Sequence, residues 1–331
     1  MKEAILEKLR CPRCREQISV WNVTEEDGGE IVEGTLACHA CGGTFPVHST
    51  IPILLIPGRR AVDEFAATLG REAQKVGFSK AVQSLADGTV EYPATRAFEP
   101  AVTAAEVREG RYRASESFWE TFSRNRLVQQ QQNAIAAHLD AMEEMWLRAE
   151  VNFADTVLDV GTGWGGALVP LVERAPQDAM ICGFDTAFLN LRVAQGQIER
   201  AQYDNVVFVV GDCLNPPFRE QLFDAVISWF GIGRIPGFSD YLQGILRLLG
   251  PGRAFSCAWT PLVNDLDGLA SQADLLGMAE RLDIPTRPDE TAGFMEAIGF
   301  EEVELTTVGP IFVLSGRAPV SEGNLRGLSG S

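Results

Sequence analysis

The sequence predicts an α/β protein with a mainly parallel sheet and a small cysteine-rich domain in front of it. Apolar strands alternate with helical segments from about residue 151 onward, which is the pattern of a parallel sheet covered by helices. Three of these strands end in an aspartate, and the first also runs into a glycine-rich turn. Four of the seven cysteines form two closely spaced pairs near the N-terminus, which is typical of a small metal-binding domain.

Length and charge limit what this chain can bind. With 331 residues it exceeds one typical domain, so we expect one large core and a smaller appendage. The 28 Lys and Arg against 45 Asp and Glu give a net charge of −17, which disfavours nucleic acid as a partner. No apolar run approaches the roughly 20 residues that span a bilayer, and the N-terminus lacks the apolar centre of a signal peptide. We therefore expect a cytoplasmic protein without a membrane partner.

The two cysteine pairs predict a structural zinc site. In Cys11-Pro-Arg-Cys14 and in Cys38-His-Ala-Cys41, a two-residue gap lets a tight turn point both thiolates at one tetrahedral ion. Because four thiolates leave no open coordination position, we do not expect a catalytic metal. A redox pair, or cysteines without any metal, is the alternative. The alternating segments 17–23 and 30–36 predict a hairpin around Asp27-Gly28-Gly29.

The stretch after the second pair adds a resemblance. Residues 42–56 read Gly-Gly-Thr-Phe-Pro-Val-His-Ser-Thr-Ile-Pro-Ile-Leu-Leu-Ile. They resemble the end of the small zinc-ribbon proteins that act as activator subunits of RNA and protein methyltransferases, and the resemblance covers about residues 5–57. In that family the ribbon packs on a separate methyltransferase subunit. The resemblance implies that residues 1–58 form a zinc-ribbon domain, fused here as a stabilising module.

Residues 59–150 are expected to connect the ribbon to the α/β core through helices. The periodicity is weak at first and becomes clearly helical from about residue 115. The apolar positions that recur there are Phe118, Phe122, Leu127, Ile135, Leu139, Met142, Met145 and Trp146. Of the three histidines, two lie in the ribbon, so His138 is the one ordinary base candidate outside it. On an amphipathic helix we expect a surface or structural role for it.

The segment from Thr156 to Gly166, Thr-Val-Leu-Asp-Val-Gly-Thr-Gly-Trp-Gly-Gly, predicts a buried strand and a ligand-binding turn. Glycine tolerates positive φ and has no Cβ, so Gly161, Gly163 and Gly166 can turn the backbone sharply and approach a ligand closely. This spacing alone also fits a dinucleotide. Asp159, however, can place a carboxylate beside the ammonium group of a bound amino acid, such as the methionine part of S-adenosylmethionine (SAM). A nicotinamide dinucleotide has no such group.

The next two strands also end in acids. Asp185 can accept both ribose hydroxyls of an adenosine. Asp212 can accept the exocyclic amine of adenine while the backbone N–H of Cys213 meets the ring. Because ligands of open α/β sheets gather at the carboxyl ends of the strands, we expect Asp159, Asp185 and Asp212 to converge on one crevice. Each acid alone would also fit a helix cap or a turn.

Together these features resemble the class I SAM-dependent methyltransferases over about residues 150–318. The resemblance implies a Rossmann-like sheet of seven strands, the last inserted antiparallel, in a core at 151–318. Because the last residues are rich in Gly and Ser, we expect 319–331 to be a disordered tail. The positions that match the family's cofactor site are Asp159, Gly161, Thr162, Gly163, Asp185, Thr186, Asp212, Cys213, Ser228 and Trp229. The preceding helices can cover the cofactor, so the residues that could face substrate are Tyr112, Arg113, Trp119, Arg124 and Arg126.

One motif is expected to mislead. Asn215-Pro-Pro-Phe218 spells the box by which adenine and glutamine amide methyltransferases hold a planar amine, but that box follows the fourth strand and here it follows the third. We therefore expect a loop without amine specificity. The fourth strand ends in Ser228-Trp-Phe-Gly-Ile-Gly-Arg234, which offers aromatic walls but no obvious general base.

These expectations lead to a SAM-dependent methyltransferase that transfers a methyl group to a small-molecule, biosynthetic acceptor by in-line displacement. Alignment of the reactants can supply much of the catalysis, so no catalytic residue needs to be recognisable. A homodimer is compatible with this organisation. One alternative is a zinc-ribbon RNA methyltransferase, against which residues 1–58 carry five Lys and Arg and eight Asp and Glu. The other is a non-catalytic SAM-binding scaffold whose ribbon recruits a partner.

Overall fold

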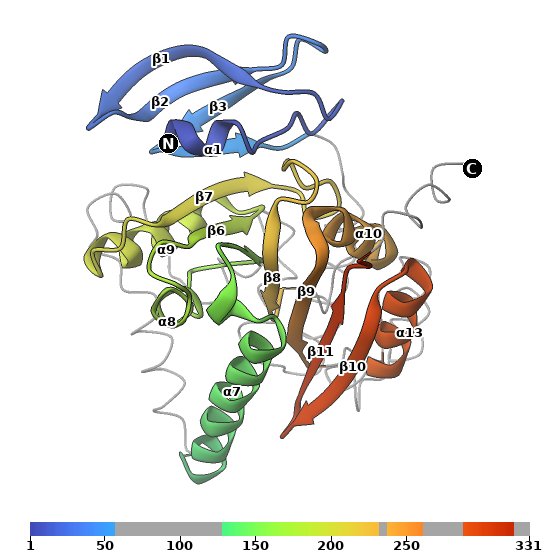
Figure 1. Cartoon of the computed structure of the whole chain (residues 1–331). Helices are drawn as coiled ribbons and strands as arrows, with labels where there is room; N and C mark the ends of the chain where they lie inside the picture. The colour runs from blue at the N-terminus through green and yellow to red at the C-terminus, as the bar shows by residue number, and fades with distance from the viewer. Residues whose placement is uncertain (57–127, 232–236, 261–286, 321–331) are drawn as a thin grey trace, which may run out of the picture.

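The computed structural model describes residues 1–56, 128–231, 237–260 and 287–320 (Figure 1). The tail from Ser321 to Ser331 lies outside the described residues. So do the residues expected to face substrate, namely Tyr112, Arg113, Trp119, Arg124 and Arg126. Among the helices that are described, none combines the length and the apolar character needed to cross a membrane.

Within the described residues, the strands build one sheet of 11 strands in the order β1-β2-β3-β4-β7-β6-β5-β8-β9-β11-β10 (Figure 1). The strands are β1 (Ser19–Asp27), β2 (Glu30–Ala37), β3 (Thr44–His48), β4 (Ile51–Leu54), β5 (Thr156–Val160), β6 (Met180–Asp185), β7 (Val206–Gly211), β8 (Phe223–Trp229), β9 (Leu249–Trp259), β10 (Glu301–Val308) and β11 (Ile311–Arg317). The helices are α1 (Glu3–Leu6), α7 (Val128–Arg148), the 3-10 helix η2 (Val151–Phe153), α8 (Leu168–Arg174), α9 (Phe188–Arg200), α10 (Phe238–Leu248) and α13 (Pro288–Ile298).

The strands from β5 onward have the predicted Rossmann-like arrangement. Strands β7, β6, β5, β8 and β9 run parallel to their neighbours. Strand β11 lies between β9 and β10 and is antiparallel to both. The α/β class and the seven-stranded sheet with an antiparallel final strand are therefore confirmed. The parallel strands are almost continuously apolar because helices cover both of their faces.

The N-terminal strands join the same sheet. Strands β1 and β2 form the expected hairpin, and Gly28 and Gly29 turn it with φ of +56° and +81°. Strand β4 then pairs in parallel with β7, where Ile53 lies opposite Val210. The sequence did not predict this pairing. It covers the backbone edge of β7, which would otherwise be open to pairing with other chains.

Two buried clusters lie on the two faces of the sheet. Helices α7, α8 and α9 pack on one face, and α10 and α13 pack on the other. The cluster around α10 and α13 also contains ribbon residues, since Met1, Ile5 and Leu9 are buried together with Phe218 and Tyr241. A module of this size buries too little apolar surface by itself, and it gains the rest from the core.

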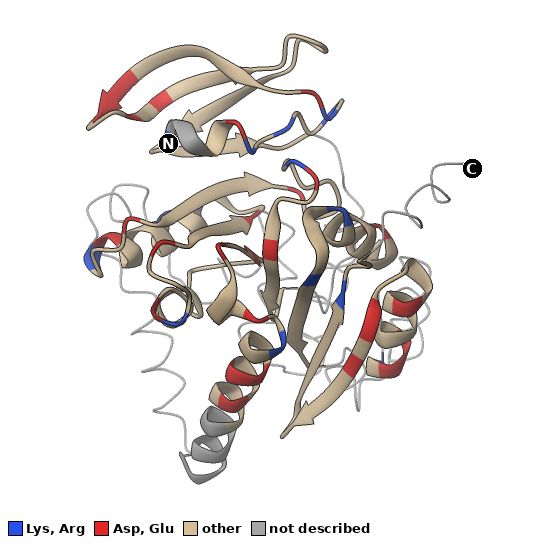
Figure 2. Cartoon of the chain, viewed as in Figure 1, with Lys and Arg blue, Asp and Glu red and all other residues tan. Residues whose placement is uncertain are grey.

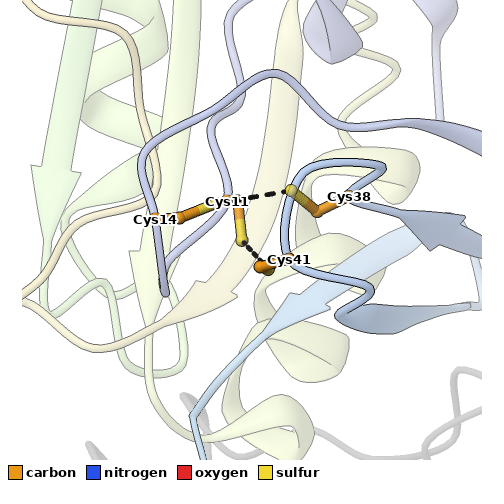
Figure 3. Close-up of side chains that lie close together, drawn as sticks. All are labelled: Cys11, Cys14, Cys38 and Cys41. Carbon is orange, nitrogen blue, oxygen red and sulfur yellow. Dashed lines mark hydrogen bonds between the residues drawn. The ribbon is translucent and has the colours of Figure 1, made fainter.

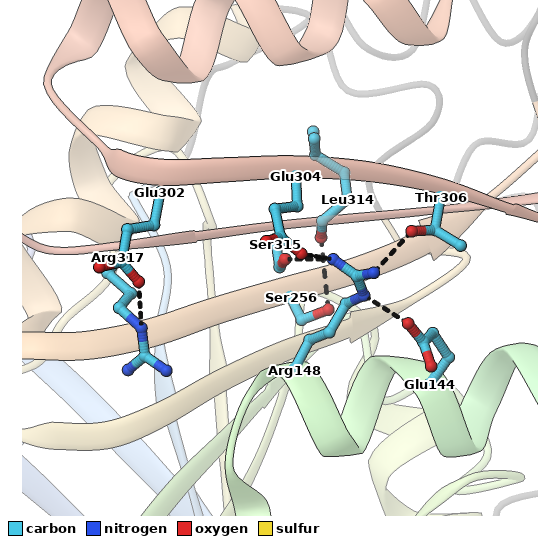
Figure 4. A network of polar contacts seen from close by, with 9 residues as sticks. All are labelled: Glu144, Arg148, Ser256, Glu302, Glu304, Thr306, Leu314, Ser315 and Arg317. Carbon is cyan, nitrogen blue, oxygen red and sulfur yellow. Dashed lines mark hydrogen bonds and ion pairs between the residues drawn. The ribbon is translucent and has the colours of Figure 1, made fainter.

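Helix α7 is fixed to the sheet by a polar network around Arg148 (Figure 4). Arg148 Nε donates to Glu144 Oε1 at 2.6 Å and Nη2 donates to Thr306 Oγ1 at 2.6 Å. The same guanidinium pairs with Glu304 on β10. These contacts hold the C-terminal end of α7 against the last two strands.

The apolar stripe predicted for this helix is only partly correct. Met142, Met145 and Trp146 are buried, as expected. Leu139, in contrast, is 62% exposed. Leu147, eight residues further along, is also exposed, at 61%. Residues eight apart share one face of a helix, so Leu139 and Leu147 lie on the face of α7 that points away from the sheet. The side chains at 128–136 and those before the helix lie outside the described set.

Candidate cofactor site and metal centre

The turn after β5 has the tight conformation that its glycines predict. Gly161 and Gly163 have φ of +76° and +55°, a region in which a side chain is strained. A Cβ at Gly161 would also lie 2.9 Å from Gly231 Cα. The third glycine in this region is Gly165, at φ +82°, and Gly166 has a conventional φ with open space around it. The turn-forming role expected of Gly166 is therefore wrong, because spacing does not tell which of two adjacent glycines takes the turn.

Asp159 is buried within β5. It is 2% exposed, and its Oδ1 atom has no hydrogen-bond partner in the described part of the chain. Burial raises the pKa of Asp159 to about 7, and the nearby carboxylate of Asp185 adds to the rise. A buried carboxylate oxygen without a partner is costly unless a ligand supplies one.

Asp185 ends β6 and ties the glycine turn to the start of α9. Its Oδ2 accepts the backbone N–H of Gly163 at 2.9 Å and its Oδ1 accepts that of Ala187 at 2.8 Å. Burial raises the pKa of Asp185, and these backbone hydrogen bonds work against the rise. Each carboxylate oxygen keeps a second lone pair, so both can still accept a ligand hydroxyl.

The two threonines of the predicted site differ in what their hydroxyls do. Thr162 Oγ1 donates to the carbonyl of Asp159 at 2.8 Å and accepts the N–H of Phe184 at 2.9 Å. Its side chain thus links β5 to β6 and shapes the turn. Thr186 Oγ1 is buried and has no partner among the described residues, so this hydroxyl is suited to a ligand contact.

Asp212 and Cys213 follow β7. Asp212 Oδ1 accepts the N–H of Leu214 at 2.9 Å. Burial raises the pKa of the Cys213 thiol, and the carboxylates of Asp212 and Asp185 raise it further. Strand β6 pairs in parallel with both β5 and β7, with Val160 opposite Phe184 and Asp185 opposite Val210. The acids that end these three strands therefore lie at the same end of the sheet.

The end of β8 presents aromatic rings. Ser228 is fully buried and donates through Oγ to the carbonyl of Val160 at 2.8 Å, which ties β8 to β5. Trp229 is half-buried, and its ring centroid lies 4.9 Å from that of Phe230. His138 of α7 lies against both rings. His138 was expected to have a surface or structural role, and its contact with these two rings could not be predicted, because only the tertiary fold brings α7 to the carboxyl end of β8.

The four cysteines of the ribbon lie together (Figure 3). The Sγ atoms of Cys11 and Cys41 are 3.6 Å apart and those of Cys14 and Cys38 are 3.5 Å apart, with all four within 4.8 Å of one another. Four Zn–S bonds of about 2.3 Å give a tetrahedron with edges of about 3.8 Å, so this spacing fits one zinc ion. All four are free thiols.

The ribbon holds the loop that follows Asp212. The Arg15 guanidinium donates to the carbonyl of Phe218 at 2.7 Å and also to that of Pro216. The Asn215 side chain donates to the carbonyl of Pro12. Asn215-Pro-Pro-Phe218 is thus a docking segment for the ribbon, a role that its sequence did not predict. Figure 2 shows Lys and Arg at the ribbon loops that face the core.

Comparisons with known proteins agree with this architecture. Residues 157–252 match the family model described as "Methyltransferase domain". A demethylmenaquinone methyltransferase of Porphyromonas gingivalis is 27% identical over 143 residues, which are 39% of this chain and 58% of the relative. One of Geobacillus is 28% identical over 123 residues, 37% of this chain and 53% of the relative. The chain thus spans little more than half the length of these relatives. A SAM-dependent methyltransferase structure from Aquifex aeolicus has 17% identity and a TM-score of 0.44, and covers 54% of this chain and 88% of its own.

The matched residues are similar to a methyltransferase domain. They carry β5, the glycine turn, Asp185, Asp212 and β8, which are the parts of the sheet described above. The seven-stranded sheet around them, with its antiparallel last strand, is the fold of the class I SAM-dependent methyltransferases.

Proposed function

We propose that this chain is a SAM-dependent methyltransferase that acts on a small-molecule acceptor. The observation that carries the proposal is the meeting of Asp159, Asp185 and Asp212 beside the glycine turn, at the carboxyl ends of β5, β6 and β7. Ligands of open α/β sheets bind at this edge. When bound, SAM supplies an electrophilic methyl group. The protein contributes by binding SAM and the acceptor and by aligning them for transfer.

Each acid has a proposed part in holding the cofactor. Asp159 receives the ammonium group, Asp185 the ribose hydroxyls, and Asp212 the amine of adenine, with the backbone of Cys213 beside the ring. Asp159 Oδ1 and Thr186 Oγ1 are buried and have no hydrogen-bond partner within the described residues, which fits a site that a polar ligand completes.

The remaining predicted positions complete the proposed site. Gly161, Thr162 and Gly163 form the turn around the cofactor. Ser228 and Trp229 border its methyl end. No general base is assigned, because displacement at a sulfonium methyl group needs one only where the acceptor must lose a proton.

The division of the chain into parts belongs to the same proposal. Residues 1–58 are the zinc ribbon, 59–150 the connecting region, 151–318 the methyltransferase core and 319–331 a tail. Cys11, Cys14, Cys38 and Cys41 would hold a structural zinc ion, whose chemistry is limited to ordering the ribbon. That order matters to the core, because the first cysteine turn also carries Arg15, which contacts the loop after Asp212.

A small-molecule acceptor has more support than RNA. The net charge of −17 repels a polyanion, and the named relatives act on demethylmenaquinone by their names. The ribbon arginines Arg10 and Arg15 give hydrogen bonds to protein carbonyls, which leaves those donors poorly placed for phosphates. Because a methyl acceptor must be a nucleophile, the reduced form of demethylmenaquinone, demethylmenaquinol, is the first acceptor to test. The scaffold alternative has one feature in its favour, since Trp21 on β1 is 66% exposed.

The test is calorimetric titration of the zinc-loaded protein with S-adenosylhomocysteine, and in parallel with NADH. We expect micromolar binding of the adenosyl ligand and none of NADH. Asp185→Asn should weaken that binding by about tenfold or more, because a charge-assisted hydrogen bond contributes roughly 1.5–3 kcal/mol. Asp178→Ala, which changes an exposed aspartate before β6, is the control and should bind as the unmodified chain does.

Three results decide among the alternatives. Preference for NADH, or S-adenosylhomocysteine binding that Asp185→Asn leaves intact, would refute the assignment of the three aspartates to a SAM site. Binding without methyl transfer from labelled SAM to demethylmenaquinol or to a small-molecule extract would favour the scaffold. Transfer to RNA instead would favour the RNA methyltransferase.

A further inference from the structure

Three rings meet at the carboxyl end of β8. The imidazole of His138 is nearly parallel to the ring of Phe230, with an angle of 7° and centroids 5.6 Å apart. It meets the ring of Trp229 edge-on, at 73° and 6.0 Å. Trp229 and Phe230 are themselves edge-on at 4.9 Å. Offset-stacked and edge-to-face arrangements are the favourable ones for aromatic rings, so the three form one ordered cluster.

Phe230 is held in a strained conformation within this cluster. Its φ is +56°, a left-handed value that costs a bulky residue about 1–3 kcal/mol. The backbone N–H of Phe230 donates to the carbonyl of Ala258 at 2.8 Å, which fixes the residue against β9. Nevertheless, the side chain is 40% exposed. Apolar burial therefore does not account for the strain, and residues in such conformations gather at ligand sites.

The cluster borders the proposed cofactor site. Gly231, the residue after Phe230, approaches the glycine turn so closely that a Cβ on Gly161 would lie 2.9 Å from Gly231 Cα. A methyl acceptor must reach the cofactor within contact distance. The exposed ring of Phe230 and the ring of His138 thus stand where an acceptor would have to enter.

Building on the proposed function, we infer that His138, Trp229 and Phe230 form the acceptor-binding wall and that the acceptor presents a planar aromatic ring. A flat acceptor ring can extend the stack that His138 and Phe230 form. The ring of Trp229 then bounds the acceptor on another side. Stacked and edge-to-face ring pairs contribute to binding beyond the burial of their apolar surface. A saturated ring of the same size would lose this contribution, so the wall selects for planarity as well as for apolar character.

The test uses the fact that the chain has three histidines. The protein, with ring-labelled histidine and saturating S-adenosylhomocysteine, is titrated with 1-naphthol and with decahydro-1-naphthol while the histidine Cε1–H signals are followed by NMR. His138→Asn assigns the signal. We expect 1-naphthol to shift the His138 signal saturably and the saturated alcohol to leave it in place. His39, whose ring lies 6.4 Å from that of Trp21 in the ribbon, is the internal control and should not respond.

A pair of variants separates this wall from general aromatic packing. Phe230→Leu should weaken 1-naphthol binding about three- to tenfold and leave S-adenosylhomocysteine affinity unchanged. Phe153→Leu is the matched control. Phe153 is 79% exposed and directly precedes β5, so it lies at the amino-terminal ends of the parallel strands, away from the carboxyl end of β8.

Several outcomes would overturn the inference. These are an unmoved His138 signal while S-adenosylhomocysteine binds, equal shifts with both alcohols, and equal effects of the two Phe variants. A loss of S-adenosylhomocysteine affinity in Phe230→Leu would show that this ring serves the cofactor instead. Failure of the unmodified protein to bind S-adenosylhomocysteine would refute the proposed function itself, and the wall with it.

Discussion

The ribbon and the methyltransferase core share one sheet but are stabilised in different ways. Strand β5 in the core has four of its five residues buried, whereas β1 in the ribbon has no buried residue along its nine. The core can rely on apolar burial on both faces of its sheet. The ribbon relies on a four-cysteine cluster and on contacts with the core. Continuity of a sheet therefore does not imply a common source of stability.

The two regions meet at the loop that follows Asp212. Arg15, next to the cysteine cluster, contacts carbonyls of Pro216 and Phe218 in that loop. The glycine turn, in contrast, is held by Asp185 and by strand pairing inside the core. Loss of order in the ribbon should therefore affect the adenine end of the proposed cofactor site more than its methionine end.

Loss of the proposed zinc ion should have the largest effect. Cys38→Ser should lose the zinc ion, and with it a contribution on the order of 10 kcal/mol that the ribbon's own apolar burial does not replace. Hydrogen exchange should then accelerate in β1, β2 and β3 while β5 and β8 stay protected. Cys182→Ala, a buried cysteine of β6, is the control and should keep the metal. Unchanged exchange in β1 to β3 after loss of the ion would contradict the proposed dependence on zinc.

Within the core, the glycine turn should be the most sensitive point. Gly161→Ala places a side chain at φ +76° against the backbone of Gly231, so we expect a loss of about 1–3 kcal/mol in unfolding free energy. S-Adenosylhomocysteine binding should fall with it. Gly166→Ala meets open space and should be neutral or slightly stabilising. Thermal unfolding and calorimetry measure both effects, and equal behaviour of the two variants would refute the difference drawn between these glycines.

The contact between the regions should have an intermediate effect. Arg15→Ala removes two hydrogen bonds from a charged donor, which contribute about 1–3 kcal/mol to docking of the ribbon. Exchange should accelerate in residues 212–218, and S-adenosylhomocysteine affinity should fall severalfold. Arg13→Ala changes an exposed neighbour and should do neither. Unchanged affinity in Arg15→Ala would show that the ribbon and the cofactor site are independent.

The pH dependence of binding should show the smallest effect. Burial raises the pKa of Asp159 from 3.8 to about 7, so below pH 7 the carboxyl is increasingly protonated in the folded protein. If the carboxylate receives the ammonium group, S-adenosylhomocysteine affinity should rise by up to about tenfold per pH unit toward pH 7. Asp159→Asn should bind weakly and without this slope. The same slope in both proteins would exclude Asp159 as its origin.

The same raised pKa sets the sign of the stability change in the ligand-free protein. Between about pH 4 and 7 the folded state binds more protons at Asp159 than the unfolded state does. The contribution of Asp159 to the free energy of unfolding is therefore fully present below about pH 4 and is lost as the pH rises toward 7. Chemical denaturation at several pH values measures it, with Asp159→Asn as the control.

Much of the fold and of the candidate site could be predicted from local patterns. Parallel strands that are buried on both faces read as apolar runs, and the glycine spacing after β5 predicted its turn. That the acids at the ends of β5, β6 and β7 lie at the same end of the sheet was predictable, because the carboxyl ends of parallel strands lie side by side. Gly165 could not be chosen over Gly166 from the sequence, since both lie in the same short turn. The folded chain distinguishes them by the positive φ of Gly165 and by its close packing against Ala194.

The sequence by itself determined the α/β class, the cysteine cluster and the residues available for a cofactor, because each depends on spacing within a few residues. Only the tertiary structure decided that β4 extends the sheet beside β7, that Arg15 docks on Asn215-Pro-Pro-Phe218, and that His138 stacks on Phe230. These pairs are far apart along the chain, and no local pattern encodes which distant partner a strand edge, a cation or a ring will meet. Packing of the whole chain selects among those partners, and the acceptor site that we infer is a product of that selection.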